Sequence, residues 1–418
     1  MAKFVIEEAK RCLQCKKPLC KEGCPVKTPI NEVINMFLNG KIREAGEKLF
    51  KNNPLSVLCS LVCPHEKQCE GHCVLNKSKK SNPIQFGLIE HYISDYYLNL
   101  LKPEHKPIDP NKKVAIIGSG PAGITIAFIL AEKGYDITIF EFYDKIGGVL
   151  RYGIPDFRLP KSILERIKDK LVEMGVKIRP NTMIGSHITI DDLFRDGYKA
   201  VFIGIGVWQP NRLKIKGESL GHVHFAINYL NNPDVYNLGK SLCVIGAGNV
   251  AMDVARTALR KGVRDVYIMY RKGPGHVSAS ISEVECAKLD GVKFEFYKQP
   301  VEILDKGIKY VETKFIKDDE ENEKLITIDG TEKIFEVDSV IIATGQGPRG
   351  SITLQKKIKM DQYGLVITDD YGRTTREGVF ASGDIVTGAK TVVEAVRASK
   401  NVAQAIDEYV SKHYLGEN

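Results

Sequence analysis

The chain has 418 residues, of which 43% are hydrophobic and 27% charged, a composition typical of a globular protein with two or three domains. No apolar run approaches the roughly 20 residues that cross a bilayer, and the charged stretch before Cys12 lacks the apolar core of a secretory leader, so we expect a cytoplasmic protein. The formal charge of +8 is spread along the chain without a basic block, which argues against nucleic-acid binding.

Eight of the ten cysteines lie before residue 74. They are Cys12, Cys15, Cys20, Cys24, Cys59, Cys63, Cys69 and Cys73. Proline follows Cys24 and Cys63, and a short cysteine run ending in C-P is typical of the ligands of a cubane 4Fe–4S cluster. Disulfides would need an oxidising compartment, and zinc would favour two C-x2-C pairs, of which there is one. With helical patterns at residues 30–39 and 84–101, we predict a helical domain that holds two 4Fe–4S clusters.

From residue 112 onward, short β-branched strands alternate with amphipathic helices, which predicts α/β domains after a proline-containing linker at 102–111. A strand at 114–117 runs into G-x-G-x-x-G and a helix, and a second strand ends in an acid. Such glycines permit a tight turn, the approach of a pyrophosphate and close helix–strand packing, and the acid accepts hydrogen bonds from the adenosine ribose. The predicted binding residues are Gly118, Gly120, Pro121, Ala122, Gly123 and Glu141.

A second motif of this kind follows the strand at 242–245, with alanine as an accepted variant of its third glycine. Where the first site has an acid, the strand at 266–270 ends in a basic pair. An acid selects a free ribose 2′-hydroxyl, whereas a basic pair neutralises a 2′-phosphate, so we predict NADP(H) here. The predicted binding residues are Gly246, Gly248, Asn249, Val250, Ala251, Arg271 and Lys272.

Two nucleotide folds in one chain, the first with an acid and the second with a basic pair, predict FAD in the first and NADPH in the second. A buried strand at 340–343 runs into a turn, and another strand ends at an acid suited to the flavin ribityl chain or pyrophosphate. The helix after residue 390 directs its N-terminus toward negative charge on the reduced flavin. These segments contribute Thr344, Gly345, Gly383, Asp384, Thr391, Val392 and Val393.

Nearly the whole chain resembles the small (beta) subunit of bacterial glutamate synthase and the N-terminal, electron-input part of dihydropyrimidine dehydrogenase. The resemblance rests on E-A-K-R-C-L-Q-C at 8–15, on the two cysteine runs, on both glycine motifs, and on Y-G-I-P-D-F-R-L-P at 152–160. It implies a helical iron–sulfur domain at 1–110, an FAD domain at 111–211 and 346–418, and an NADPH domain inserted at 212–345. It also places Gly148, Leu150 and Arg158 near the flavin, Arg158 with a catalytic role.

The resemblance further implies which residues bind iron. Counting alone assigns the eight N-terminal cysteines to the two clusters. The family pattern instead gives Cys12, Cys15, Cys20 and Cys73 to one cluster, and Cys24, Cys63, Cys69 and Glu90 to the other. On that pattern, which we favour, Cys59 binds no iron. One departure from the family is V-S-A at 277–279 in place of Met-Pro-Ala, which leaves the role of Glu283 open.

The expected function is that of an enzyme subunit that oxidises NADPH, because a flavin is needed to divide a hydride into single electrons for iron–sulfur clusters. We expect the electron acceptor to be a partner polypeptide with an FMN or iron–sulfur group. Alternatives are a subunit of a two-component dihydropyrimidine dehydrogenase or of a transhydrogenase-type or sulfide-dehydrogenase-type complex. A disulfide reductase is disfavoured because only Cys243 and Cys286 lie in the α/β part, and a simple electron carrier because it needs no nucleotide domains.

Overall fold

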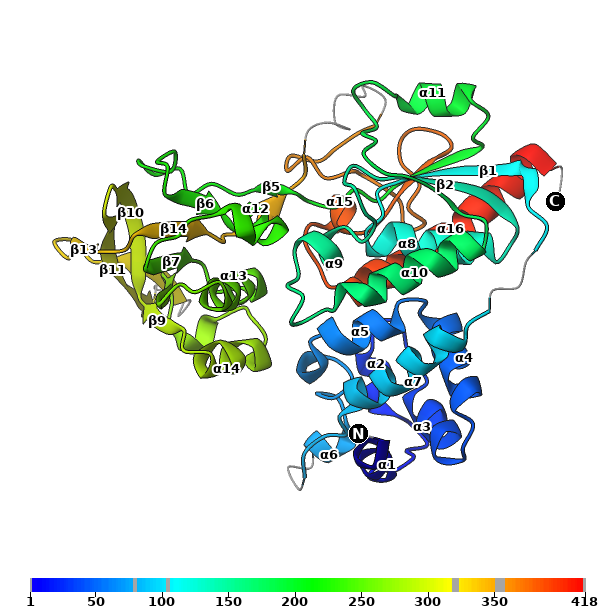
Figure 1. Cartoon of the computed structure of the whole chain (residues 1–418), viewed down its shortest axis with the longest axis horizontal. Helices are drawn as coiled ribbons and strands as arrows, with labels where there is room; N and C mark the ends of the chain where they lie inside the picture. The colour runs from blue at the N-terminus through cyan, green and yellow to red at the C-terminus, as the bar shows by residue number, and fades with distance from the viewer. Residues whose placement is uncertain (1, 78–80, 103–105, 318–322, 350–357, 416–418) are drawn as a thin grey trace. The chain divides into compact units, whose positions relative to one another are not determined.

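The computed structural model describes residues 2–77, 81–102, 106–317, 323–349 and 358–415. The chain forms two compact units, the first made of Met1–Arg151, Asp156–Val207 and Gly347–Asn418, the second of Tyr152–Pro155 and Trp208–Gln346. The second unit is therefore an insertion in the first (Figure 1). The expected helical domain and FAD domain both belong to the first unit. Among the described residues, no helix has the length and apolar character that crossing a membrane requires.

The N-terminal part of the first unit is a bundle of short helices. They are α1 (Ala2–Lys10), α2 (Leu19–Gly23), α3 (Ile30–Leu38), α4 (Ile42–Asn52), α5 (Ser56–Val62), α6 (Val74–Lys77) and α7 (Phe86–Leu100). Helix α3 shows why they pack: Ile30, Val33, Ile34 and Phe37 recur at helical spacing and are buried against α7. The C-P pairs end two helices, since Cys24 caps α2 and Cys63 caps α5.

The rest of the first unit is a parallel sheet in the strand order β16-β4-β1-β2-β3. Its strands are β1 (Asp109–Ile117), β2 (Tyr135–Phe140), β3 (Lys177–Arg179), β4 (Ala200–Ile203) and β16 (Val379–Ala381). Its helices are α8 (Pro121–Ala131), α9 (Val149–Tyr152), α10 (Lys161–Glu173), α11 (Ile190–Arg195), α15 (Asp384–Thr387) and α16 (Val392–Val410). Helices α8, α10 and α16 lie on one side of the sheet, and α11 lies on the other (Figure 1).

The helical bundle packs directly on this α/β part. The ring of Phe50 in α4 lies edge-on to Phe128 in α8, with 5.3 Å between centroids. Arg166 in α10 donates to Asn99 at 2.7 Å and to Asp95 at 2.5 Å, both in α7. Helix α16 also contacts α5. The cysteine-rich bundle and the first nucleotide fold therefore belong to one compact unit.

The second unit has a parallel sheet in the order β6-β14-β7-β8-β9 and an antiparallel sheet built on β11. The parallel strands are β6 (Val223–Phe225), β7 (Ser241–Ile245), β8 (Asp265–Tyr270), β9 (Lys293–Phe296) and β14 (Ser339–Ile342). The antiparallel strands are β10 (Lys298–Leu304), β11 (Gly307–Lys317), β12 (Glu323–Thr327) and β13 (Lys333–Phe335). Helices α12 (Ala226–Asn231), α13 (Asn249–Arg260) and α14 (Ile281–Leu289) complete the unit, and β5 (Gln209–Pro210) pairs with β15 (Gln346–Gly347).

Candidate functional site

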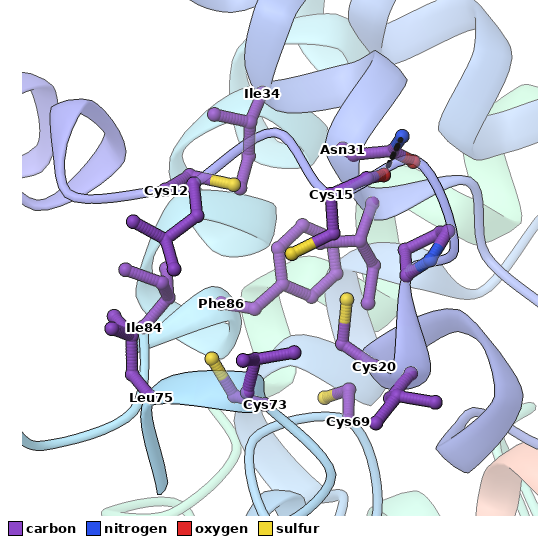
Figure 2. Close-up of a pocket in the computed structure, with 15 residues that line it drawn as sticks. Cys12, Cys15, Cys20, Asn31, Ile34, Cys69, Cys73, Leu75, Ile84 and Phe86 are labelled. Carbon is purple, nitrogen blue, oxygen red and sulfur yellow. Dashed lines mark hydrogen bonds between the residues drawn. The ribbon is translucent and has the colours of Figure 1, made fainter. Parts of the chain in front are cut away.

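One pocket in the helical bundle is lined by cysteines from distant parts of the sequence (Figure 2). They are Cys12, Cys15, Cys20, Cys69 and Cys73, set among apolar side chains. Burial raises the pKa of Cys12 and raises that of Cys20 to about 11, and both are raised further by the charges of Cys15 and Cys73. These four thiols therefore lie within electrostatic reach of one another.

A second group gathers around Glu90, a buried carboxyl group on α7. Burial raises the pKa of Cys24 and Cys69, and the Glu90 charge raises both further. The pKa of Cys63 is raised by its hydrogen bond with Cys59, then by burial, and also by Glu90. Burial is likewise the main reason that the pKa of Glu90 is well above its usual range. The structure thus brings Cys24, Cys63 and Cys69 to one carboxyl group.

Cys59 lies next to this second group and makes hydrogen bonds of its own. Its side chain is 2% exposed, and its sulfur accepts a hydrogen bond from the Asn53 amide at 3.2 Å. The same thiol is hydrogen-bonded to Cys63. Asn53 also accepts a hydrogen bond from the Leu55 amide at the start of α5, so the contact belongs to the local helix start. Cys59 is thus held by hydrogen bonds with Asn53 and Cys63.

The donor chemistry of the two groups fits 4Fe–4S clusters. Across the described part of the chain, no three His, Cys, Asp or Glu side chains converge closely enough for a single metal ion. Thiolates are the soft ligands that 4Fe–4S clusters use. The thiols that line the apolar pocket are ligands of this kind.

The first glycine motif joins β1 to α8 with the geometry expected of a dinucleotide site. Gly118 has φ +95°, and a Cβ there would lie 2.7 Å from the Gly204 oxygen. A Cβ on Gly123 would lie 2.1 Å from the Gly118 oxygen, so both positions require glycine. At Gly120 a Cβ would meet only one atom, at 3.9 Å, which leaves the N-terminus of α8 open to a phosphate. Pro121 and Ala122 begin that helix, where proline costs no hydrogen bond.

The predicted acid of this site, Glu141, follows β2 and is 4% exposed. It accepts hydrogen bonds from the Ser119 amide at 2.9 Å and the Ser119 hydroxyl, and from the Tyr143 amide at 2.8 Å. These bonds hold the carboxylate beside the glycine turn. Each carboxylate oxygen has two lone pairs, so the arrangement leaves acceptor capacity for ribose hydroxyls.

Other predicted flavin residues gather at the same end of the sheet. A Cβ on Gly148, with φ +52°, would lie 2.8 Å from the Gly120 Cα, and Leu150 is fully buried in α9. Gly383, after β16, approaches Ala122 of α8. The parallel order of β16, β4 and β1 brings these carboxyl ends together. Arg158 is partly buried in the turn between α9 and α10.

Thr391 caps α16 at this edge of the first unit. Its hydroxyl accepts from the Glu394 amide at 3.4 Å, and Glu394 accepts from the Thr391 amide at 3.0 Å, which is a capping box. Val392 and Val393 follow as the first residues of the helix. The positive end of the α16 dipole therefore lies near Asp384, whose Oδ1 accepts from the Lys390 amide at 3.1 Å.

Asp384 gives this site a testable dependence on pH. Burial raises its pKa to about 6, although the Lys390 amide opposes the shift. The folded protein therefore binds this proton more tightly than the unfolded chain, and flavin-free protein loses stability as pH rises from about 4 to about 6. Asp384→Asn keeps the acceptor oxygen but cannot ionise. We expect it to raise the free energy of unfolding by about 3 kcal/mol at pH 7.5 and by less at pH 5.

Denaturant titration of both flavin-free proteins at the two pH values measures this difference. An equal gain at both pH values would contradict the assignment of the effect to Asp384 ionisation.

The second glycine motif joins β7 to α13 in the second unit. Gly246 has φ +125°, and a Cβ there would lie 2.4 Å from the Ala343 oxygen. Gly248 is open, since a Cβ would meet only the Ser278 hydroxyl at 3.5 Å. Ala251 is fully buried where the third glycine would stand. Asn249 accepts a hydrogen bond from the Ser280 amide at 2.9 Å, which ties the motif to α14, and Val250 packs on the core.

The basic pair follows β8, as the sequence predicts. Arg271 is exposed, and the turn is fixed by Thr313, which donates to the Arg271 carbonyl at 2.5 Å, and by Tyr297, whose amide donates to the Lys272 carbonyl at 3.3 Å. The backbone is thus held while the side chains remain at the surface. Thr344 and Gly345 also lie in the second unit, after β14, where they are hydrogen-bonded to Asn211.

Glu283, whose role the sequence left open, forms an ion pair with Arg256 at 2.8 Å, and both side chains are largely buried. Arg256 also contacts Asp290 at 2.8 Å, so this network joins α13 to α14. Cys243 is fully buried in β7, where burial raises the pKa of its thiol far above the usual range. A buried, protonated thiol in a strand is a core residue and not half of a redox pair.

Sequence reasoning missed three residues that link the two parts of the first unit. Lys400 of α16 donates to the Asn52 carbonyl at 2.7 Å across 348 residues of sequence. Asn52 in turn contacts Thr28, and Thr28 contacts Cys24. No motif marks these positions, because only the packing of α16 on the bundle brings them together.

Comparison with known proteins agrees with this architecture. Residues 112–399 match the pyridine nucleotide-disulphide oxidoreductase family, and residues 1–100 match dihydropyrimidine dehydrogenase domain II, 4Fe-4S cluster. The glutamate synthase [NADPH] small chain of Escherichia coli is 34% identical, with 96% of this chain and 90% of that protein covered. The NAD-dependent dihydropyrimidine dehydrogenase subunit PreT of Salmonella typhimurium is 32% identical, with 98% and 95% covered.

A solved structure of FprA from Mycobacterium tuberculosis, in complex with NADPH, shares the fold with a TM-score of 0.62 at 18% identity, covering 74% of this chain and 86% of that one. The predicted family, fold class and enzyme class are confirmed. The chain therefore belongs to the family of the glutamate synthase small chain and is an NAD(P)H-dependent electron-input subunit, an oxidoreductase whose α/β part binds FAD and NADPH and whose helical part is a 4Fe–4S domain.

Proposed function

We propose that this chain passes electrons from NADPH to a partner polypeptide through two 4Fe–4S clusters. The observation that carries the proposal is that the N-terminal ligands gather around the cysteine pocket and around Glu90, with Cys69 in both groups, inside a bundle packed on the flavin fold. FAD, when bound, takes up the hydride and releases its electrons one at a time. The chain's own residues hold the cofactors in order and keep the metal ligands buried.

The two ligand groups have different surroundings, and this difference indicates the order in which electrons pass through the two clusters. Cys24 of the Glu90 group is connected through Thr28 and Asn52 to Lys400 on α16, the helix that begins at the flavin site. We therefore assign Cys24, Cys63, Cys69 and Glu90 to the flavin-side cluster. Cys12, Cys15, Cys20 and Cys73 form the distal cluster, from which electrons leave the chain.

The surface around the distal group suits an acidic partner. Leu13 is 59% exposed and Leu19 is 37% exposed, and both line the cysteine pocket. Lys16 and Lys17, between them in sequence, are also exposed. A small apolar centre beside positive charge favours a protein that carries acidic residues around its own FMN or iron–sulfur group.

The nucleotide assignments complete the proposal. The site of Gly118–123, Glu141, Gly148, Leu150, Asp384 and the start of α16 holds FAD, with Arg158 near the reacting ring, and the site of Gly246–Ala251 with Arg271 and Lys272 holds NADPH. The domains are then residues 1–110 for iron–sulfur, 111–211 and 346–418 for FAD, and 212–345 for NADPH.

Anaerobic purification tests this function directly. We expect about one FAD and about eight iron atoms per chain, and NADPH-dependent reduction of artificial acceptors without formation of glutamate or reduction of pyrimidines. Zinc in place of iron, or the absence of flavin, would contradict the proposal. Co-purification from the native cell identifies the partner. Rapid turnover of a small organic substrate by the isolated chain would also contradict the proposal.

A second candidate is the NAD(P)H-oxidising subunit of a two-component dihydropyrimidine dehydrogenase. It is favoured by the PreT relative, 95% of whose length is covered by the match. The same co-purification separates the two candidates, because a pyrimidine-reducing partner would restore pyrimidine reduction and a glutamate synthase large subunit would restore glutamate formation.

A further inference from the structure

A line of polar contacts runs from α16 of the flavin fold to Cys24 in the helical bundle. The Lys400 ammonium donates to the Asn52 carbonyl oxygen at 2.7 Å and to its side-chain oxygen at 3.4 Å. The Asn52 side-chain amide donates to the Thr28 hydroxyl at 3.2 Å. The Thr28 hydroxyl lies 3.3 Å from the Cys24 sulfur. Two residues, Asn52 and Thr28, thus connect the Lys400 ammonium to the Cys24 sulfur.

The direction of these hydrogen bonds follows from chemistry. A cysteine bound to iron is a thiolate and can only accept, so the Thr28 hydroxyl must donate its hydrogen to the Cys24 sulfur. The hydroxyl oxygen is then left to accept from Asn52, and Asn52 accepts from Lys400. Every donor in the line points toward the sulfur, and hydrogen bonds aligned in this way polarise one another.

The local backbone shows how Thr28 reaches the sulfur. Cys24 is followed by Pro25, and the Lys27 amide donates back to the Cys24 carbonyl at 2.9 Å. Lys27 itself has φ +54°, which turns the chain so that Thr28 returns to Cys24. Thr28 is 2% exposed, and its own carbonyl accepts from the Ile30 amide at the start of α3, so the hydroxyl is held away from competing water.

We propose that the hydrogen-bonded line Lys400–Asn52–Thr28 raises the reduction potential of the flavin-side cluster through its hydrogen bond to the Cys24 sulfur. The proposal rests on the function above, in which Cys24 binds that cluster. An electron entering the cluster adds negative charge, and hydrogen bonds to a ligand sulfur and a nearby ammonium both stabilise it. Burial lowers the pKa of Lys400, and the Cys24 charge opposes this shift.

The raised potential favours electron flow in one direction. A higher potential at the cluster nearest the flavin favours its reduction, so that electrons released by the flavin move into the bundle. The Lys400 contact lies on α16, and Thr391 at the start of that helix belongs to the flavin site. Helix α16 therefore belongs to the flavin site at its N-terminus and, through Lys400, is hydrogen-bonded to the residues beside the first cluster.

The test is a redox titration of the reduced protein, followed by electron paramagnetic resonance. Thr28→Val removes the hydroxyl at nearly constant volume, and Lys400→Met removes the charge. We expect each change to shift the reduction equilibrium of the flavin-side cluster about tenfold toward the oxidised form, which is about 59 mV for one electron. The distal cluster should keep its potential, and iron content should be unchanged.

Matched variants separate this effect from a structural one. Arg397→Met removes an exposed positive charge one turn earlier on α16, and it should leave both potentials unchanged. Thr28→Ser keeps the hydroxyl and should restore the potential. In the double variant, Lys400→Met should add little to Thr28→Val, because one line carries both effects.

Unchanged potentials in Thr28→Val and Lys400→Met, or a shift of equal size in Arg397→Met, would overturn the proposal while leaving the proposed function intact. A wild-type protein without two cluster signals would instead overturn the proposed function. Because Thr28→Ser is conservative, the test remains decisive even if Lys400→Met folds poorly.

Discussion

Glu90→Ala is expected to lower the iron content from about eight to about four atoms per chain, because Glu90 is the proposed fourth ligand of the flavin-side cluster. Glu90 is buried on α7, and its charge reaches the three cysteines of the second group. A carboxylate is a harder ligand than a thiolate, so the intact cluster should have a spectrum distinct from that of its all-cysteine neighbour. Anaerobic iron analysis and electron paramagnetic resonance measure both effects.

Cys59→Ser is the matched control for this change. Cys59 is equally buried and lies beside the same group, but its sulfur is engaged by Asn53 and Cys63. We expect the variant to keep both clusters and their spectra. Glu90→Cys should restore the iron content with an altered spectrum. Loss of one cluster in Cys59→Ser, together with an unchanged spectrum in Glu90→Ala, would show that the eight cysteines alone bind the iron.

Replacing Arg271 and Lys272 together by serine is expected to raise the KM for NADPH by roughly 100-fold or more. Hydrogen bonds from a charged group contribute about 1.5–3 kcal/mol each, and about 1.4 kcal/mol corresponds to a factor of ten. The KM for NADH should change little, because NADH has no 2′-phosphate. Steady-state kinetics with an artificial acceptor and both nucleotides gives the comparison.

Two basic residues that precede β8, at the end of the strand opposite Arg271 and Lys272, provide a control. Arg264, just before β8, has a side chain that is 84% exposed, and Lys261 precedes it at 43% exposed. Serine at both positions removes the same charge from the same domain and should leave the KM for either nucleotide unchanged. Equal use of NADH and NADPH by the unaltered protein would refute the 2′-phosphate assignment.

Short-range features were readable from the sequence. Gly118 has φ +95° in the turn of one β–α unit, and a Cβ on Gly123 would clash with the Gly118 oxygen of the same unit. A glycine motif followed by an acid or by a basic pair is likewise a local pattern, because strand, turn and helix are consecutive. The cysteine spacing predicted iron–sulfur chemistry for the same reason.

Long-range pairing was not readable from spacing. The structure places Cys73 with Cys12, Cys15 and Cys20, and joins Cys24 to Glu90, but only family resemblance suggested either grouping beforehand. The role of Glu283 stayed open until its ion pair with Arg256 was seen. Each of these contacts joins segments that are not adjacent in the sequence, and such contacts depend on how whole elements pack together.

The sequence by itself determined the chemistry of this protein: its cysteines, its two glycine motifs and the charge that ends each second strand. Only the tertiary structure decided which side chains gather around the cysteine pocket and around Glu90, and that Lys400 is connected to Cys24. The physical reason is that residue type and short spacing specify what a site can bind, whereas the neighbours of a buried sulfur are chosen by the packing of helices far apart in the chain.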